Sequence, residues 1–386
     1  SPGNVRVWIY DYFDTGLLKT VVTPDQITLN YTYDDRSYLL SVTDHLNQSM
    51  VYTYDEHKNV IKTETISSDG SLALLVDSVY DVRNRLVETR APHNVTEESI
   101  TQRILDENSN LIGLIDPNGN PSNNAYDPFN RLDANTHREN GITQYEYDDQ
   151  DRIIQVIAPN GVTTDYEYDL ISRRTKEISP DRGTLTYSYD KANNVTSITD
   201  GRGITATMTY DELERVSTKT YPNTIPGKTE NVSYTYDTCD FGLGRLCART
   251  DESGTYNYNY DAFGNLITQT FTEQGGIAYT TAYVYDDGDH IVQMTLPSGR
   301  IVDYARDGVR RVQAIDTTVN GLPQTLVSDI QYRGDNQILA KTYGNALTDT
   351  RTYDLQGRLL TQQLEDGSGF TLDQRSYSYD KNSNIL

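Results

Sequence analysis

The sequence is poor in the residues that build thick cores and reactive sites. Its 386 residues include two Cys, three Met, one Trp and six Phe, and 36% of them are apolar. That apolar share is below the value usual for globular proteins. The longest apolar runs are short, as in Leu72–Val76, whereas a membrane-spanning helix needs about 20 such residues. The shortage excludes a membrane span and argues against domains built around a thick core.

Basic residues are also scarce. There are 33 Lys and Arg against 56 Asp and Glu, so the formal net charge is -23. Nucleic-acid binding requires clustered Lys and Arg, and anionic membrane surfaces attract the same residues. The charge therefore predicts no nucleic-acid partner, and it suits either a solvated acidic surface or a cationic protein partner.

The usual signatures of catalysis and metal binding are missing. There is no Gly-x-Ser-x-Gly, no P-loop and no His-Glu-x-x-His, and none of the five His stands at metal-ligand spacing from another. Asp148–Asp151 and Asp286–Asp289 resemble calcium loops in composition but lack the distal bidentate Glu. Paired carboxylates for glycosidic chemistry are not excluded, yet no pair stands out. We predict no catalytic residue, no metal site and no cofactor.

What the chain has instead is tyrosine, with 31 residues, and a repeated Tyr-Asp dipeptide. Three degenerate copies fill gaps in the series: Leu105-Asp106, Arg306-Asp307 and Tyr332-Arg333. The fourteen intact copies begin at Tyr10, Tyr33, Tyr54, Tyr80, Tyr126, Tyr147, Tyr168, Tyr189, Tyr210, Tyr236, Tyr260, Tyr285, Tyr353 and Tyr379.

The spacing of these copies defines the domain organisation. It is 21 residues five times running between Leu105 and Tyr210, and elsewhere it is 21 or stretches to 23–26. A fixed period with small insertions indicates one structural unit with loops of variable length. We predict a single array over residues 1–386, with about 17 units of 21–26 residues and its most regular part at 105–211. The chain starts Ser1-Pro2-Gly3 and stops inside a repeat, so we expect a piece of a larger protein truncated at both ends.

Each unit is predicted to be a β-hairpin. In Thr163–Gly183, an alternating strand-forming segment ends at Tyr168, a turn follows, and a second strand precedes the turn at Pro180–Gly183. No segment shows a helical period. Two strands per unit give about 34 strands, and because strands twist, a continuous ribbon of that length must coil and enclose space.

The motif tyrosines are predicted to share one face of the sheet. In Tyr-x-Tyr-Asp the two Tyr lie two residues apart, and residues i and i+2 of a strand point the same way. Stacking repeat upon repeat would then produce aromatic ladders. The structural residues predicted on this basis are Tyr145, Tyr147, Asp148, Tyr166, Tyr168, Asp169, Tyr187, Tyr189, Asp190, Tyr258, Tyr260 and Asp261.

The Asp of each motif has a different predicted role. At the end of a strand its carboxylate can accept hydrogen bonds from backbone N–H groups of the following turn. A small or turn-forming residue, an Arg and an apolar residue then open the return strand, as in Asp151-Arg152-Ile153. From the spacing we predict that this Arg pairs with the Asp before the turn.

These residues resemble the YD-repeat, or Rhs-repeat, family, whose signature is Tyr-x-Tyr-Asp-x-x-Gly-Arg-Leu followed by a Pro/Asp-Gly turn. Tyr258–Leu266 and Tyr145–Ile153 are similar to it, and the resemblance covers essentially the whole chain. The family includes bacterial Rhs polymorphic toxins, the C components of insecticidal Tc toxins, wall-associated proteins and teneurins. The resemblance implies a curled or spiralling ribbon of antiparallel β-hairpins, an all-β shell.

The resemblance also implies a function. In the toxins such a shell encloses a C-terminal toxin, so we expect a non-enzymatic wall segment of a secreted bacterial protein, whose partner is an enclosed toxin or effector. The Asp-Pro-x-Gly-Leu motif that usually closes such shells is absent, since Asp116-Pro117 and Asp127-Pro128 do not fit it. Neither the shell end nor a toxin domain is visible. The alternative is an extracellular adhesion module that binds carbohydrate or a surface protein.

The two cysteines, Cys239 and Cys247, flank an enlarged hairpin turn within one repeat. Cross-strand bonding is geometrically plausible at this position, and the exported character of the family favours a disulfide. The alternative is a pair of reduced thiols. Without a nearby His, two Cys do not make a zinc site.

Overall fold

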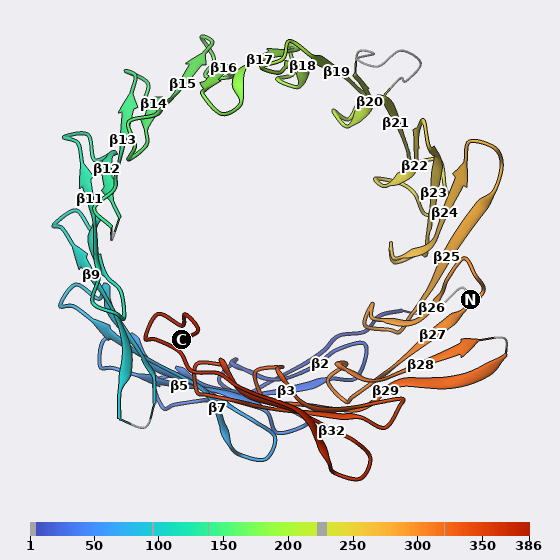
Figure 1. Ribbon diagram of the computed structural model, residues 1–386. Helices are drawn as coiled ribbons and strands as arrows, with labels where there is room; N and C mark the ends of the chain where they lie inside the picture. Colours follow the sequence, from blue (N-terminus) through green and yellow to red (C-terminus); the bar gives the residue numbers. More distant parts are fainter. Residues whose placement is uncertain (1–4, 95, 138, 222–229, 320) are drawn as a thin grey trace. The chain divides into compact units, whose positions relative to one another are not determined.

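The computed structural model describes residues 5–94, 96–137, 139–221, 230–319 and 321–386. Within them it contains 33 β-strands and no helix (Figure 1). Consecutive strands pair antiparallel, as β13 does with β14 and β14 with β15. The all-β, tandem-hairpin fold predicted from the repeat is confirmed.

The chain forms two compact units. One contains the chain up to Pro121 together with Val284–Leu386. Its strands are β1 (Ile9–Tyr12), β2 (Leu18–Val22), β3 (Thr28–Tyr33), β4 (Leu39–Asp44), β5 (Ser49–Tyr54), β6 (Val60–Ile66), β7 (Leu72–Tyr80), β8 (Leu86–Pro92), β9 (Glu98–Leu105), β10 (Leu111–Ile115), β26 (Ile291–Thr295), β27 (Ile301–Arg306), β28 (Val312–Val319), β29 (Leu322–Tyr332), β30 (Ile338–Tyr343), β31 (Thr348–Tyr353), β32 (Leu359–Glu365) and β33 (Thr371–Ser376).

The other unit is Ser122–Tyr283. Its boundaries fall inside its first and last strands, and it holds the most regular repeats. Its strands are β11 (Pro121–Tyr126), β12 (Leu132–Thr136), β13 (Ile142–Tyr147), β14 (Ile153–Ile157), β15 (Thr163–Tyr168), β16 (Arg174–Ser179), β17 (Gly183–Tyr189), β18 (Val195–Thr199), β19 (Thr205–Tyr210), β20 (Val216–Tyr221), β21 (Glu230–Tyr236), β22 (Leu246–Asp251), β23 (Gly254–Tyr260), β24 (Leu266–Glu273) and β25 (Ala278–Tyr285).

Two kinds of turn alternate along this ribbon. The motif turn is the five-residue turn that begins at the motif Asp, and the opposite turn joins each return strand to the next motif strand. In the motif turn between β13 and β14, the N–H of Asp148 donates to the carbonyl of Arg152 at 3.0 Å, and Asp151 donates back to Asp148 at 3.1 Å. The opposite turn after β14 has the same pattern, with Gly161 donating to Ala158 at 2.8 Å.

The ribbon has a drier and a wetter face but no thick core. Along β13 exposure alternates, so that Tyr145 and Tyr147 are half-buried while Gln144 and Glu146 are exposed. Among the described residues only six apolar side chains are buried: Val21, Ala73, Ala206, Cys247, Val302 and Ile330. Each repeat therefore buries little apolar area, and polar contacts between repeats contribute a larger share of the stability than they do in a globular core.

Candidate functional site

The motif Asp closes its own turn. The Oδ1 atom of Asp148 accepts hydrogen bonds from the backbone N–H of Gln150 at 2.9 Å and of Arg152 at 3.0 Å. Its Oδ2 atom accepts one from Nε of Arg152 at 2.7 Å. Asp169 and Asp211 repeat this geometry with their own Arg. The predicted pairing of Arg with the preceding Asp is confirmed in seven motif turns, at Arg85, Arg131, Arg152, Arg173, Arg215, Arg311 and Arg358. It is wrong at Arg245, because Nη1 of Arg245 donates to the carbonyl of Phe241 at 2.9 Å and Asp237 pairs with Arg215 instead.

The same Arg reaches forward to the next repeat. Nη1 of Arg152 donates to the carbonyl oxygen of Asp169 at 3.0 Å, and its guanidinium carbon lies 4.7 Å from the ring centroid of Tyr168. Arg131 and Arg173 lie over Tyr147 and Tyr189 at 4.6 and 4.7 Å. The predicted contact was one tyrosine ring stacked on another, so the contact between the arginine and the tyrosine ring was not predicted. The available signal was the 21-residue period, which places each Arg 17 residues before the next motif Asp.

The second tyrosine of each motif ties its repeat to the one before. The hydroxyl of Tyr168 donates to the carbonyl of Ile153 at 2.8 Å, and that of Tyr147 to Leu132 at 2.7 Å. Tyr189 and Tyr260 do the same with Arg174 and Leu246, both at 2.7 Å. Burial raises the pKa of Tyr168 and Tyr260, which keeps their hydroxyls protonated as donors. We call this chain of Asp, Arg and Tyr contacts the ladder.

The remaining predicted residues fit the ladder with small changes. Asp190 and Asp261 bond an Asn in place of Arg, at Asn194 and Asn265. Tyr145, Tyr166, Tyr187 and Tyr258 lie on the same face as their partners in the motif. The guanidinium of Arg174 contacts the rings of both Tyr166 and Tyr187, at 5.6 and 5.1 Å.

Two degenerate motifs keep the ladder with different residues. Arg306 stands where Tyr is expected, and its Nη2 donates to the carbonyl of Ile291 at 2.7 Å, the bond that Tyr hydroxyls make elsewhere. Arg333 stands where Asp is expected. It pairs with Asp335, donates to the carbonyl of Asp354 at 2.8 Å and lies 5.1 Å from the Tyr353 ring. Arg333 thus makes the forward contacts that the turn Arg makes in regular repeats.

A second set of contacts joins distant parts of the ribbon within the unit that contains both chain ends. Motif turns of residues 286–384 lie against opposite turns of residues 23–120, with partners 257 to 285 residues apart. We call this boundary the seam (Figure 1). It is polar: Arg311 donates to Oε1 of Gln48 at 2.8 Å, and the N–H of Gly334 donates to Oγ of Ser67 at 3.0 Å.

The seam continues through three further turns. Nε2 of Gln356 donates to the carbonyl of Pro92 at 2.8 Å and to Oγ of Ser99 at 2.9 Å. Nδ2 of Asn382 donates to Asp116 at 2.6 Å. At the opposite turn of residues 23–27, Nε of Arg310 lies 3.4 Å from Oδ2 of Asp25, whose side chain is only 5% exposed. No single pattern in the sequence marks these partners, because they are ordinary turn residues.

The other candidates from the sequence have plain structural settings. The structure joins Cys239 and Cys247 in a disulfide across the enlarged turn, with Cα atoms 5.4 Å apart. In the acidic segments, Asp148 is engaged by Arg152, and Asp286 accepts hydrogen bonds from the N–H groups of Gly288 and His290. Among the described residues no group of three or more His, Cys, Asp or Glu is placed to hold a metal ion. The described part of the chain also contains no helix suited to crossing a membrane.

Together the fold and the ladder define a β-hairpin repeat protein held by contacts between neighbouring repeats. The family model "RHS Repeat" matches residues 147–184 and 189–225. These residues therefore contain Rhs repeats, as the resemblance implied. No curated protein matches the sequence significantly.

The solved structures with a similar fold include Tc toxin complexes. The Photorhabdus luminescens Tc holotoxin pore is similar over 99% of this chain, with a TM-score of 0.76 and 16% identity, and the match spans 22% of that chain. The TcdB2-TccC3 structure matches 98% of this chain at a TM-score of 0.67 and 13% identity, over 27% of its own length. TcdB2-TccC3-Cdc42 matches 93% at a TM-score of 0.67 and 15% identity, over 22%. This chain thus spans about a quarter of the chains it matches.

The ladder predicts that one hydroxyl per repeat matters for stability. Replacing Tyr168 with Phe leaves the carbonyl of Ile153 without its donor and should lower the local free energy of unfolding by about 1 kcal/mol. The matched control is Tyr166→Phe, because no hydrogen bond to the Tyr166 hydroxyl is seen among the described residues. The measurement is the protection of the backbone amides of β14 and β15 against hydrogen exchange in each variant. If the backbone amides are equally protected in Tyr168→Phe and Tyr166→Phe, the Tyr168 hydroxyl does not contribute to the stability of the ladder.

The ladder also predicts sensitivity to acid. The side-chain bond from Arg152 holds the pKa of Asp148 below its usual 3.8, and Arg215 does the same for Asp211. A carboxyl whose pKa falls on folding stabilises the folded chain above the unfolded pKa, and this contribution is lost as pH falls through the folded pKa. We expect a thermal midpoint that changes little from pH 7 to about 5 and drops steeply below about 4.

The control for this prediction changes the carboxylates themselves. In the triple variant Asp148→Asn, Asp169→Asn, Asp211→Asn, the amide oxygen still accepts the turn N–H groups but forms no ion pair. Its midpoint should be lower at pH 7 and should fall less between pH 5 and pH 3. Thermal unfolding followed by circular dichroism at each pH decides the matter. An unchanged acid response in the variant would show that other groups cause it.

Proposed function

We propose that this chain is a section of the wall of a β-shell in a secreted bacterial Rhs/YD-repeat protein, and that the complete shell encloses or carries a C-terminal toxin. The observation that carries the proposal is the seam. Turns 257 to 285 residues apart meet edge to edge within one unit, so an early and a late section of the ribbon lie side by side there. A wall built from a narrow ribbon requires lateral contacts of this kind.

The chemistry of the seam and of the surface fits such a wall. The seam partners named above are joined by hydrogen bonds and an ion pair, which suit a boundary assembled from turns that were hydrated before contact. The mechanism would be steric, because a closed wall keeps an enclosed polypeptide apart from its surroundings. The net charge of -23 favours retention of a basic cargo. Neither the ladder nor the seam supplies a nucleophile paired with a base, so we infer a structural role without catalysis.

The shape of the chain in solution tests the wall. A filled globule of this length would have a radius of gyration of about 21 Å. We expect small-angle scattering to give a clearly larger value, with density displaced from the centre of mass. The double variant Arg310→Glu, Gln356→Ala removes two seam donors and should widen the profile further.

The control is Arg202→Glu, which breaks an exposed ion pair with Asp200 outside the seam and should leave the profile unchanged. A compact, filled profile for the unmodified chain would end the wall proposal. If the seam variant scatters like the unmodified chain, the seam does not close the ribbon in solution.

Secretion is a separate part of the proposal and rests on the disulfide, since disulfides persist in oxidising compartments. We expect the exported protein to contain the Cys239–Cys247 bond. Its intact mass should lie about 2 Da below that of the reduced chain, and neither thiol should react with an alkylating agent under denaturing conditions until a reductant is added. A Cys247→Ser variant, with one free thiol, provides the positive control for alkylation. Immediate alkylation of both cysteines in the unmodified protein would contradict the disulfide.

A further inference from the structure

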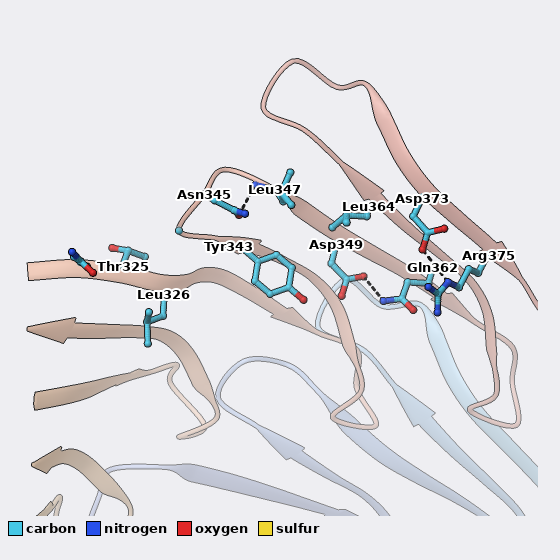
Figure 2. A pocket seen from close by; sticks show the side chains of 12 residues that line it. Thr325, Leu326, Tyr343, Asn345, Leu347, Asp349, Gln362, Leu364, Asp373 and Arg375 are labelled. Carbon is cyan, nitrogen blue, oxygen red and sulfur yellow. Dashed lines mark hydrogen bonds and ion pairs between the residues drawn. The ribbon is translucent and has the colours of Figure 1, made fainter. Parts of the chain in front are cut away.

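The ribbon departs from its regular repeat around β29. The interval from Asp307 to Arg333 is 26 residues instead of 21, and β29 is the longest strand described, with 11 residues. Its register with β30 shifts twice, and the turn after β30 folds onto it, where the N–H of Gly344 donates to the carbonyl of Leu326 at 2.9 Å. A pocket of about 950 Å³ opens here, over β29–β33 (Figure 2).

Charged side chains replace packing residues in and beside this pocket. Asp349 lies four residues before the second motif tyrosine, Tyr353, and the regular repeats have Thr143, Thr164, Leu185 and Ala206 at this place. Its exposure is only 1%. Two residues further on, Arg351 occupies the position that Tyr145, Tyr166 and Tyr187 fill elsewhere. A buried charge lowers stability unless it is well paired, so these replacements are costly for a purely structural strand.

The pairing around Asp349 fixes the polar groups of the pocket. Arg351 donates to Asp349 at 2.8 Å, Lys341 lies 3.8 Å away, and Nε2 of Gln362 donates to Asp349 at 3.1 Å. Because the amide N–H of Gln362 is held by Asp349, its carbonyl oxygen is left as an oriented acceptor (Figure 2). Fixed polar groups of this kind are typical of binding sites.

The other elements of the pocket are an aromatic ring and an exposed ion pair. Tyr343 lines the pocket, and the Lys341 ammonium lies 4.8 Å from its ring centroid. Across the pocket, β33 contributes Asp373 and Arg375, which pair at 2.9 Å while remaining 51% and 63% exposed. The pocket thus combines one aromatic face with planar amide, carboxylate and guanidinium groups (Figure 2).

We propose that this pocket binds a short saccharide. The aromatic ring of Tyr343 offers a face for the C–H side of a sugar ring, while Gln362, Asp373 and Arg375 offer planar donors and acceptors that match neighbouring hydroxyls two at a time. A peptide fits less well. The three leucines of the pocket do not make the apolar groove that a helical peptide requires.

The test uses the 386-residue chain and an array of defined oligosaccharides, followed by calorimetric titration with the best binder. We expect at least one saccharide to bind. Tyr343→Ala and Arg375→Ala should each weaken binding about tenfold or more, while Tyr343→Phe should retain it because the ring remains. The Arg375 side chain is largely exposed, so its removal leaves the fold intact and the test does not depend on the stability of the Tyr343→Ala variant.

The chain supplies a matched control. The tripeptide Lys-Thr-Tyr occurs at Lys219–Tyr221 as well as at Lys341–Tyr343, and Lys219 lies 5.0 Å from the Tyr221 ring in the same way. Tyr221 does not line this pocket, so Tyr221→Ala should bind as tightly as the unmodified chain. The proposal is overturned if no saccharide binds, if Tyr221→Ala loses as much affinity as Tyr343→Ala, or if only peptides on a parallel array bind. None of these outcomes bears on the scattering test of the wall.

Discussion

The carboxylate of the motif aspartate is the contact on which the other contacts of this ribbon depend. A five-residue turn leaves backbone N–H groups pointing inward, and Oδ1 of Asp148 accepts two of them. The fourth turn residue takes a left-handed conformation even where it is not Gly, with φ of 61° at Asp151 and 68° at Ser172. That conformation costs about 1 kcal/mol or more in an ordinary residue. The carboxylate helps to offset this cost, and its second oxygen then holds the arginine that reaches the next repeat.

This arrangement explains how a chain without a thick core holds together. Where the turn arginine and the motif tyrosine are kept, a repeat contacts its neighbours through that Arg, the Tyr hydroxyl and the strand pairing, so stability is approximately a sum of nearest-neighbour terms. Arg306 and Arg333 show what the ladder requires of each position. The former bonds the carbonyl that a Tyr hydroxyl would reach, and the latter takes over the forward reach of the turn arginine. Each position requires a side-chain donor long enough to reach the carbonyl oxygen in the neighbouring repeat, and the Tyr-Asp motif is the commonest sequence that meets this requirement.

The sequence predicted the features that recur with the 21-residue period. Strand pairs, turn positions, the shared face of the tyrosines and the pairing of Asp with the following Arg all depend on residues close in the chain, so spacing alone was informative. The forward reach of Arg152 to Tyr168 was missed because a ring was expected to pack on a ring. The seam was beyond such reasoning, since Gln48, Ser67 and Gln356 are polar turn residues whose partners lie more than 250 residues away. The pocket was missed because it depends on how β29 departs from the period.

The departure of β29 from the 21-residue period divides the ribbon into regular and irregular repeats, which can have different roles. In the regular repeats that end at Tyr147, Tyr168 and Tyr189, the corresponding positions on the motif face are filled by Thr or Leu and by Tyr. At β31 the same positions carry Asp349 and Arg351, which neutralise each other and organise Gln362. The ladder continues past them undisturbed, because the Tyr353 hydroxyl still donates to the carbonyl of Ile338 at 2.9 Å. A repeat architecture tolerates such a substitution because the loss of packing is confined to adjacent strands. The ladder therefore comes from the regular repeats and the proposed binding pocket from the irregular ones, and β31 keeps both sets of contacts.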